Sequence, residues 1–335
     1  MAPEPDEVAL AYYVRQQRIV RRTVDQVQAT WRLLDLRDWD ASWQLVVSSG
    51  LVGAVTAGQT EAAAHSDAYV AAVIAADGLD SDPAGKLDPL AFAGLASDGR
   101  PLKSLFYESV LEARWLLEEV GQSEVDAMIG GLEKLLRAAS TQVADAGRTA
   151  TGASLAGNRT INGYIRVVNP PACARCLILA GKEFGWNAGF QRHPKCDCVH
   201  MPARLVARGR RHPGVFDAKT YFNGLSAAEQ NRIFTHAGAQ AIRDGADIGS
   251  VVNARRGMYT ADAYGQRVRA TRDSATRRGS WYRQERQRAI ERGLVPRSGR
   301  GFRLRSPRLL PEEIYRLSGS RSEALAMLRR FGYLT

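Results

Sequence analysis

The sequence is poor in the side chains that build most reactive centres, and it has no long apolar run. Its 335 residues include only four cysteines and five histidines. The most apolar stretch, residues 45–57, is interrupted by serine and glycine and is too short to span a bilayer. The first residues are acidic and lack the compact apolar core of a secretory signal. These absences predict a protein that is made in the cytoplasm and has no membrane contact.

Several catalytic motifs are also missing. The sequence has no H-E-x-x-H, G-x-S-x-G or G-x-x-x-x-G-K-[ST], which argues against a zincin-type metalloprotease, a nucleophile elbow and a P-loop. His193 and His200 lie beside a cysteine motif, as in HNH-type nucleases, but no Asp-His or His-His pair precedes a helix at the required distance. A Ser-His protease stays open, because folding rather than sequence adjacency brings such residues together.

Charge is distributed unevenly along the chain. Residues 201–335 contain 27 Lys and Arg against 11 Asp and Glu, whereas residues 1–200 contain 19 against 24. Lys219 is the only lysine among those 27, and the planar guanidinium of arginine suits phosphates and carboxylates. Two interpretations remain open. The arginines could bind an anionic partner, such as DNA or an acidic protein, or they could form a solvated face in a protein from a GC-rich genome.

Helical periodicity dominates residues 1–157, for which we predict a long helical bundle. The predicted helices cover residues 6–36, 39–76 with a break near 50–53, 102–121 and 123–146. Asp38 and Ser123 precede two of these helices and are placed to cap their first turns. Residues 77–89 are rich in Asp, Gly and Pro, and are predicted to form a loop.

Residues 158–203 mix β-branched and aromatic residues, which predicts a small β-rich lobe. Residues 164–168 are predicted to form one strand, and residues 177–184 a second strand with its turn at Gly181. The cysteine-rich stretch lies in the same lobe.

Residues 204–335 are predicted to form a basic region of helices and extended chain. The predicted helices are residues 227–244, 248–254, 310–317 and 322–334. Residues 295–308 are too rich in Gly, Pro and Ser to be helical. Residues 242–256 resemble a helix-turn-helix, although two plainly packed helices give the same pattern. The predicted fold class is therefore mainly α.

All four cysteines lie within 26 residues. Cys173 and Cys176 form a C-x-x-C pair, a spacing that lets both thiolates bind one ion. Farther along lie His193, Cys196 and Cys198, so a tetrahedral site could use all four cysteines or could take His193 in place of one of the last two. In a reducing compartment this clustering favours a structural zinc ion, whose binding would help to fold the lobe. Disulfides and a redox C-x-x-C remain alternatives.

The same stretch carries a family resemblance. The sequences NPPACARCLILAGKEF and, after a short insertion, RHPKCDC resemble the signature that closes the head-morphogenesis domain of MuF-like minor capsid proteins of tailed bacteriophages. The matching positions are Cys173, Cys176, Leu179, Gly181, Lys182, Phe184, His193, Pro194, Cys196 and Cys198. Together with the helical region before it, the resemblance covers residues 1–203. WNAGFQRHPKCDC and GAQAIRDGADIGSVVNARRGM also resemble head-assembly proteins of actinobacterial phages, some of which are labelled capsid maturation proteases.

The resemblance implies a structural protein of the virion, assembled in the host cytoplasm and placed in few copies at or near the portal vertex. It would assist head assembly and DNA packaging or delivery, with the portal protein, the major capsid protein and packaged double-stranded DNA as partners. The family supplies no catalytic residues, so we expect no enzymatic activity. A capsid maturation protease is the first alternative, and a DNA-binding or HNH-like nuclease protein is the second.

The basic region extends past the shared signature. We expect the acidic helical region to contact portal or capsid protein, while arginines face packaged DNA, whose phosphates give strong, salt-dependent binding without sequence preference. The candidate residues are Arg277, Arg278, Arg283, Arg286, Arg288, Arg297, Arg300, Arg303, Arg305 and Arg308.

Overall fold

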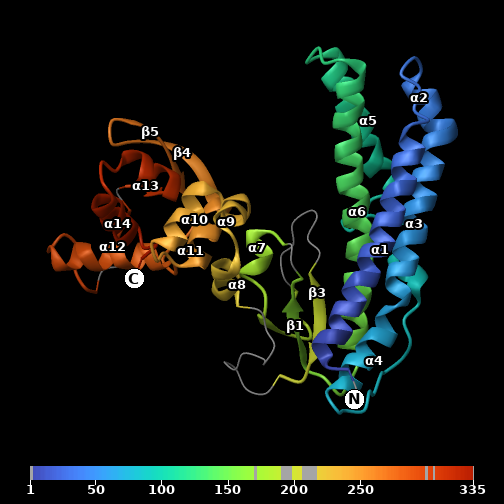
Figure 1. Ribbon diagram of the computed structural model, residues 1–335, viewed down its shortest axis with the longest axis horizontal. Coiled ribbons are helices and arrows are strands. Elements are labelled where there is room, and N and C mark those ends of the chain that lie inside the picture. Colours follow the sequence, from blue (N-terminus) through green and yellow to red (C-terminus); the bar gives the residue numbers. More distant parts are fainter. Residues whose placement is uncertain are drawn as a thin grey trace. The chain divides into compact units, whose positions relative to one another are not determined.

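The computed structural model describes residues 3–169, 172–189, 198–205, 217–298, 301–304 and 306–334. It is 60% helix and 10% strand, with two small antiparallel sheets, which confirms the predicted mainly α class. The chain divides into two compact units (Figure 1): Met1–Pro170 with Ala180–Val215, and Pro171–Leu179 with Phe216–Thr335. Among the described residues, no helix combines the length and apolar character needed to cross a bilayer.

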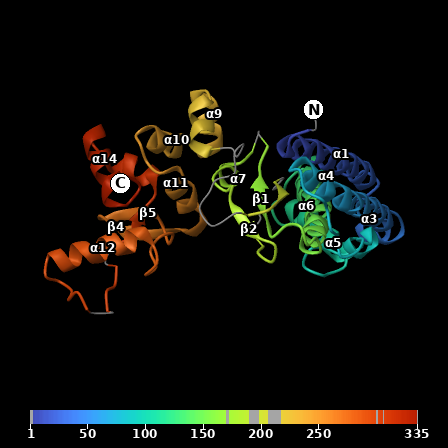
Figure 2. The ribbon, with the colours of Figure 1, turned by 90° about the horizontal axis from the view of Figure 1, so that it is seen from below.

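Long helices make up most of the first unit. They are α1 (Pro5–Trp31), α2 (Trp39–Ser42), α3 (Ser48–Ala64), α4 (Ser66–Ala76), α5 (Leu102–Glu118) and α6 (Glu124–Ala156), with a π-helical turn at Trp43–Val47 and a 3-10 turn at Pro89–Phe92. Helix α6 contacts α1, α3, α4 and α5, and it therefore lies at the centre of this group (Figure 2).

Side-chain caps begin two of these helices, as predicted. Asp38 Oδ1 accepts a hydrogen bond from the backbone N–H of Ala41 at 3.1 Å, and Ser123 Oγ accepts one from Asp126 at 3.2 Å. The predicted ends and breaks are less accurate. Helix α1 ends five residues early, α6 continues ten residues further, and α3 runs unbroken through residues 50–53. Packing overrides the glycine signal at the last site, because α3 lies close against α1 there.

Two groups of buried side chains hold the first unit together. One lies between α1, α3, α5 and α6 and includes Trp31 and Trp43, which are almost fully buried. The other joins the start of α1, helix α4 and the end of α6 to a sheet. At this second group the rings of Tyr12 and Tyr69 stack with centroids 3.9 Å apart, and Tyr69 Oη donates a hydrogen bond to the backbone carbonyl of His200 at 2.9 Å.

That sheet has the order β2–β1–β3 and is antiparallel throughout. Its strands are β1 (Gly163–Val167), β2 (Glu183–Gly185) and β3 (Val199–Ala203). The first predicted strand is confirmed. The second is wrong over most of its length, because residues 174–177 form a helical turn, α7 (Ala174–Leu177), and the chain becomes extended only at Glu183. Gly181 does occupy a turn, at a positive φ of 74°.

The second unit combines short helices with a second antiparallel sheet of order β4–β5–β6. Besides α7 its elements are α8 (Ala218–Gly224), α9 (Ala227–Phe234), α10 (His236–Arg243), α11 (Ile248–Ala254), a 3-10 turn (Arg255–Gly257), β4 (Met258–Ala263), β5 (Gln266–Thr271), α12 (Ser280–Glu291), β6 (Arg308–Leu309), α13 (Pro311–Leu317) and α14 (Arg321–Arg330). The sequence analysis did not predict this sheet. Helices α11, α13 and α14 match their predicted positions closely.

The predicted helix over residues 227–244 is two helices. Thr235 has a φ of 67°, a left-handed conformation that interrupts the helical hydrogen bonds. Its side chain then caps α10 by accepting a hydrogen bond from the backbone N–H of Gly238 at 3.3 Å. As predicted for residues 295–308, residues 301–304 have no regular secondary structure.

Two glycines of α6 should respond oppositely to substitution by alanine. A Cβ at Gly131 would lie 2.7 Å from the Ser109 carbonyl oxygen and 2.8 Å from the Trp31 ring, whereas nothing lies within 4 Å of a Cβ at Gly152. We expect Gly131→Ala to lower the free energy of unfolding by about 1–3 kcal/mol through overpacking. Gly152→Ala should raise it by about 0.5–1 kcal/mol, because alanine favours the helix. Urea unfolding followed by circular dichroism measures both, and equal shifts in one direction would contradict the close approach of α5 and α6.

Candidate nucleic-acid interface

The cysteines occupy defined positions next to short elements. Cys173 precedes α7 and is exposed, while Cys176 lies within α7 and is buried. Residues three apart on a helical turn face the same side, so this pair has the donor chemistry and spacing of half a zinc site. Cys198 is buried directly before β3, and its carbonyl oxygen accepts a hydrogen bond from Arg148 Nε at 2.9 Å.

The remaining candidate ligands, His193 and Cys196, lie outside the described residues. Within the described part of the chain, no three His, Cys, Asp or Glu side chains gather into a possible metal site. The zinc site therefore stays a prediction.

In the basic region, arginines of the unit itself neutralise many of the acidic residues. Five acids form ion pairs there: Asp244 with Arg321, Asp273 with Arg308, Glu285 with Arg288, Glu312 with Arg255, and Glu313 with Arg269 and Arg316. Four more accept hydrogen bonds from backbone N–H groups at helix N-termini: Asp217, Glu229, Asp247 and Glu323. Nine of the eleven acids in residues 201–335 are thus engaged within the fold, although Glu229, Asp247 and Glu323 stay exposed. The excess of arginine over these acids gives the region its positive charge.

Three of these acids have lowered pKa values: Glu229, through hydrogen bonds from Ser226, and the more buried Asp244 and Glu313. Burial alone would raise the pKa of the last two carboxyl groups, but hydrogen bonds outweigh it. The carboxylate of Asp244 accepts hydrogen bonds from Tyr315 and Arg321, and that of Glu313 accepts them from Arg316 and Arg269. The pKa values of both carboxyl groups therefore lie below their usual range. These carboxylates stabilise the unit at neutral pH, and the contribution is lost as the pH falls through their folded-state pKa values.

Arg308 serves the interior of the second unit. Its side chain is fully buried, Nε donates to the Phe331 carbonyl at 2.8 Å, and Nη1 donates to Asp273 Oδ2 at 2.9 Å. The guanidinium also lies 4.2 Å from the centre of the Tyr333 ring. Burial raises the pKa of Tyr333 to about 12, although Arg308 partly opposes the shift. In this structure Arg308 therefore binds its own chain rather than presenting its charge to a partner.

The other predicted arginines differ in exposure. Arg277, Arg278, Arg283, Arg297 and Arg303 are exposed, Arg286 and Arg288 are half-buried, and Arg300 and Arg305 lie outside the described residues. The two half-buried side chains also bind the unit internally. Arg286 Nη2 donates to the Arg297 carbonyl at 2.8 Å, and Arg288 Nη1 donates to the Arg330 carbonyl at 3.1 Å.

The segment that resembles a helix-turn-helix does form two helices around a turn, with Gly245 at a φ of 99°. At least two of its three arginines contact neighbouring side chains of the same unit. Arg243 binds the amide oxygen of Gln230 at 2.8 Å, and Arg255 is paired with Glu312.

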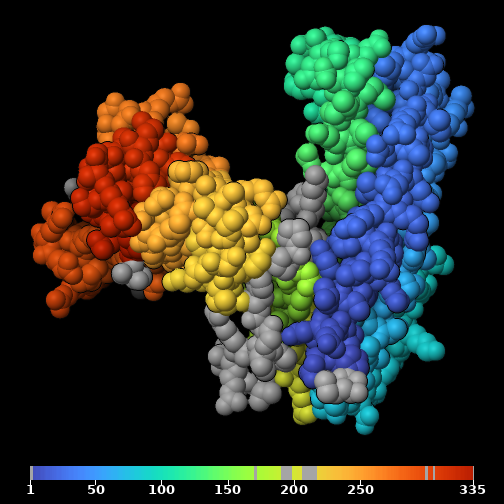
Figure 3. Space-filling view, viewed as in Figure 1, coloured from blue at the N-terminus to red at the C-terminus, as the bar shows by residue number. Residues whose placement is uncertain are grey.

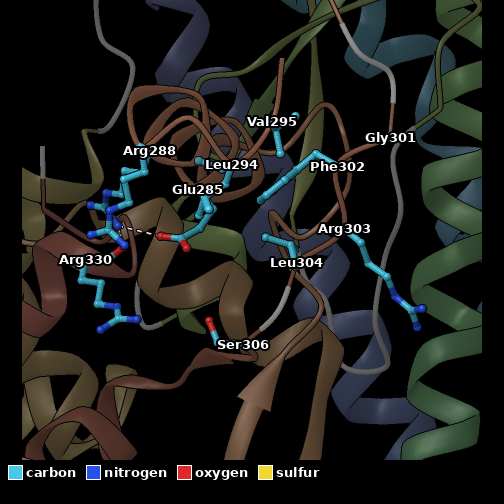
Figure 4. Close-up of a pocket in the computed structure, with 12 residues that line it drawn as sticks. Glu285, Arg288, Leu294, Val295, Gly301, Phe302, Arg303, Leu304, Ser306 and Arg330 are labelled. Atoms are coloured by element: carbon cyan, nitrogen blue, oxygen red, sulfur yellow. Dashed lines mark hydrogen bonds and ion pairs between the residues drawn. The ribbon is translucent and has the colours of Figure 1, made fainter. Parts of the chain in front are cut away.

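A pocket of about 740 Å³ lies beside α12 (Figure 4). Helix α12 ends in a glycine turn, where the Leu294 N–H bonds the Ala289 carbonyl at 2.9 Å and Gly293 has a φ of 70°. The chain then returns along the helix. Tyr282 Oη donates a hydrogen bond to the Phe302 carbonyl at 2.8 Å, and the two rings meet edge to face. The end of α14 supplies a third wall.

The pocket is positive at both ends and apolar in the middle. Four arginines line it: Arg288, Arg292, Arg303 and Arg330. Only one acid does, Glu285, whose carboxylate binds Arg288 Nη1 at 2.7 Å. Figure 4 shows Arg288 and Arg330 on one side, Arg303 extending away on the other, and Leu294, Phe302 and Leu304 between them.

Comparisons with protein-family models, with curated proteins and with solved structures give no match to this chain. What it does must therefore be inferred from its own residues. Sequence reasoning found Arg288 and Arg303 but missed the pocket that they share with Arg292 and Arg330. Two features of the sequence could have indicated the pocket: Gly293, just after the basic helix, and Phe302, which lies between Arg300 and Arg303.

Replacing Arg308 by methionine should lower the free energy of unfolding much more than replacing Arg303 by methionine. Arg308→Met leaves the partly buried Asp273 carboxylate and three carbonyl groups without this donor, so we expect the free energy of unfolding to fall by about 3 kcal/mol. Arg303→Met changes an exposed side chain and should shift it by no more than about 0.5 kcal/mol. Urea unfolding followed by circular dichroism tests the pair, and equal stability of the two variants would contradict the structural role of Arg308.

Proposed function

We propose that the chain is a minor capsid protein of a tailed bacteriophage, of the MuF-like head-morphogenesis type. It would act at or near the portal vertex in head assembly and in DNA packaging or delivery. The family proposal rests on the cysteine-rich signature of residues 173–198. The proposed contact with DNA is carried by one observation: the acids of the second unit are used within the fold, and exposed arginines keep the surface positive.

The first unit offers a surface for the protein partners at the turn between α5 and α6. We call residues 115–133 the α5–α6 tip. Trp115, Val120, Val125 and Ile129 are each 47–68% exposed there, which is unusual for large apolar side chains grouped within two helix ends. Figure 3 shows the tip, in green, at one end of the helices of the first unit.

The tip is also strongly acidic. Its five charged residues are Glu118, Glu119, Glu124, Asp126 and Glu133, and no basic residue occurs between Arg114 and Lys134. An apolar surface with acidic neighbours fits a partner whose contact face is apolar and basic. We therefore assign the tip to the portal protein or the major capsid protein, and the arginine surface to packaged double-stranded DNA.

In finer detail, we propose that the helices of the first unit act as a bundle and that the cysteine-rich residues 173–198 form a zinc-knuckle-like site. Cys173 and Cys176 would supply two thiolates, and the other ligands would come from His193, Cys196 and Cys198. Zinc bound in this way would contribute folding free energy.

Changes at the tip should reduce incorporation into particles. The full chain would be co-expressed with its portal and major capsid proteins, and tagged chain would be located in the particles by electron microscopy. We expect it at the portal vertex, and Trp115→Ser with Val125→Ser should lower incorporation by about tenfold or more. Leu90→Ser is the control, because Leu90 is 68% exposed in the same unit but lies outside the tip.

Unchanged incorporation of the tip variant would contradict the assignment of this surface. Cleaved capsid subunits, abolished by a single Ser or His substitution in the chain, would support a maturation protease instead.

The purified full chain should carry about one tightly bound zinc ion. Cys176→Ser removes a thiolate and should lower the zinc content and the thermal unfolding temperature together, because metal binding and folding are linked. Elemental analysis and calorimetry measure the two, with His65→Ala as a control that changes a histidine outside the cluster. Zinc-free protein with an unfolding temperature insensitive to chelator would refute the site.

A further inference from the structure

We propose that the pocket beside α12 binds one unstacked nucleotide of a DNA strand. The base would lie on Phe302, and phosphates would lie at the two arginine ends. This inference rests on the proposed contact between the second unit and DNA, and it identifies where and in what form the strand is held.

The chemistry of the pocket matches a nucleotide within a strand. Its volume, about 740 Å³, falls within the range of ordinary small-molecule sites. Arg288 and Arg330 lie on one side of the apolar middle, and Arg303 extends away on the other (Figure 4). If Arg303 turned toward the pocket, the arrangement would correspond to the order phosphate, base, phosphate along a strand. An inorganic anion would use only one end and would leave the apolar wall exposed to water.

Phe302 is held where a base could stack on it. Its backbone carbonyl is tied to Tyr282 Oη, and its ring packs against the Tyr282 ring with centroids 5.3 Å apart at 70°. The ring is half-buried, so one part of it remains accessible to the pocket. Aromatic side chains in basic grooves bind single strands by stacking on successive bases, with little sequence preference.

The cationic end at Arg288 is also positioned in advance. Arg288 is fixed by Glu285 and by the Arg330 carbonyl, so its guanidinium is oriented before any ligand arrives. Arg292 and Arg330 are exposed beside it, and their charge is available for a phosphate. In a duplex the bases are stacked inside the helix. Its phosphates could contact these arginines, but its bases could not stack on Phe302. The pocket should therefore prefer single strands and unpaired ends.

The test compares affinities of the full chain for a short oligothymidylate and for a blunt duplex of random sequence, measured by fluorescence anisotropy at several salt concentrations. We expect Phe302→Ala to weaken binding of the oligothymidylate by about tenfold. Duplex binding depends on phosphate contacts and should change by less than about twofold. Phe302→Leu keeps apolar packing against Tyr282 and should show the same selective loss, and thermal unfolding checks that both variants fold.

Two neighbouring arginines of α14 allow a matched test of the phosphate contact at the Arg330 end of the pocket. Arg330 lines the pocket, whereas its exposed neighbour Arg329 does not. Arg330→Ala should reduce the slope of log affinity against log salt for the oligothymidylate by about 0.7, the value for one phosphate contact on a single strand. Arg329→Ala should leave that slope unchanged.

Three results would contradict the proposal that the pocket binds a nucleotide of a single strand. They are unchanged oligothymidylate binding by the Phe302 variants, equal losses for oligothymidylate and duplex, or competition by thymidine monophosphate as effective as that by the strand. If the wild-type chain binds duplex with strong salt dependence in these cases, the proposed DNA contact stands and only the pocket fails. If the wild-type chain binds neither DNA, both fail.

Discussion

The second unit depends on the buried guanidinium of Arg308. A fully buried positive charge is tolerated only when acceptors surround it, and here they come from two places in the chain, Asp273 and residues 331–332. Asp273 precedes α12, Phe331 follows α14, and Arg308 itself lies in β6. Helix α12 and the end of α14 also supply residues that line the pocket. One ion pair and its carbonyl partners thus tie the segment before α12, strand β6 and the residues after α14 to one another.

The charge of this unit follows from how its acids are used. Ion pairs and helix caps within the fold take up most of the carboxylates, which therefore do little to offset arginines elsewhere on the surface. A chain with the same composition but with all its acids free on the surface would have positive and negative charges interspersed there. Here most carboxylates are engaged within the fold, a distribution that would favour the proposed binding of polyanions through their phosphates.

Local signals predicted local structure well. The caps at Asp38 and Ser123 and the two closing helices depend on residues close in sequence, and all were found. The break at Thr235 and the β4–β5–β6 sheet were missed, although Thr235 caps α10 locally and a two-residue turn at Tyr264 and Gly265 joins β4 to β5. The arginines show the limit of such signals, since Arg303 and Arg308 lie in one short basic stretch. Only long-range contacts make one a buried structural residue and the other an exposed cation.

The length of α6 has a mechanical consequence. Its 33 residues form one continuous helix, with the acidic tip at one end and contacts to β1 and β3 at the other. At the rise of an α-helix this is a rod of about 50 Å. Because no loop interrupts it, force applied by a partner at the tip travels along the helix to the sheet rather than being absorbed in between. The first unit is therefore a stiff spacer that holds whatever binds the tip at a set distance from the sheet.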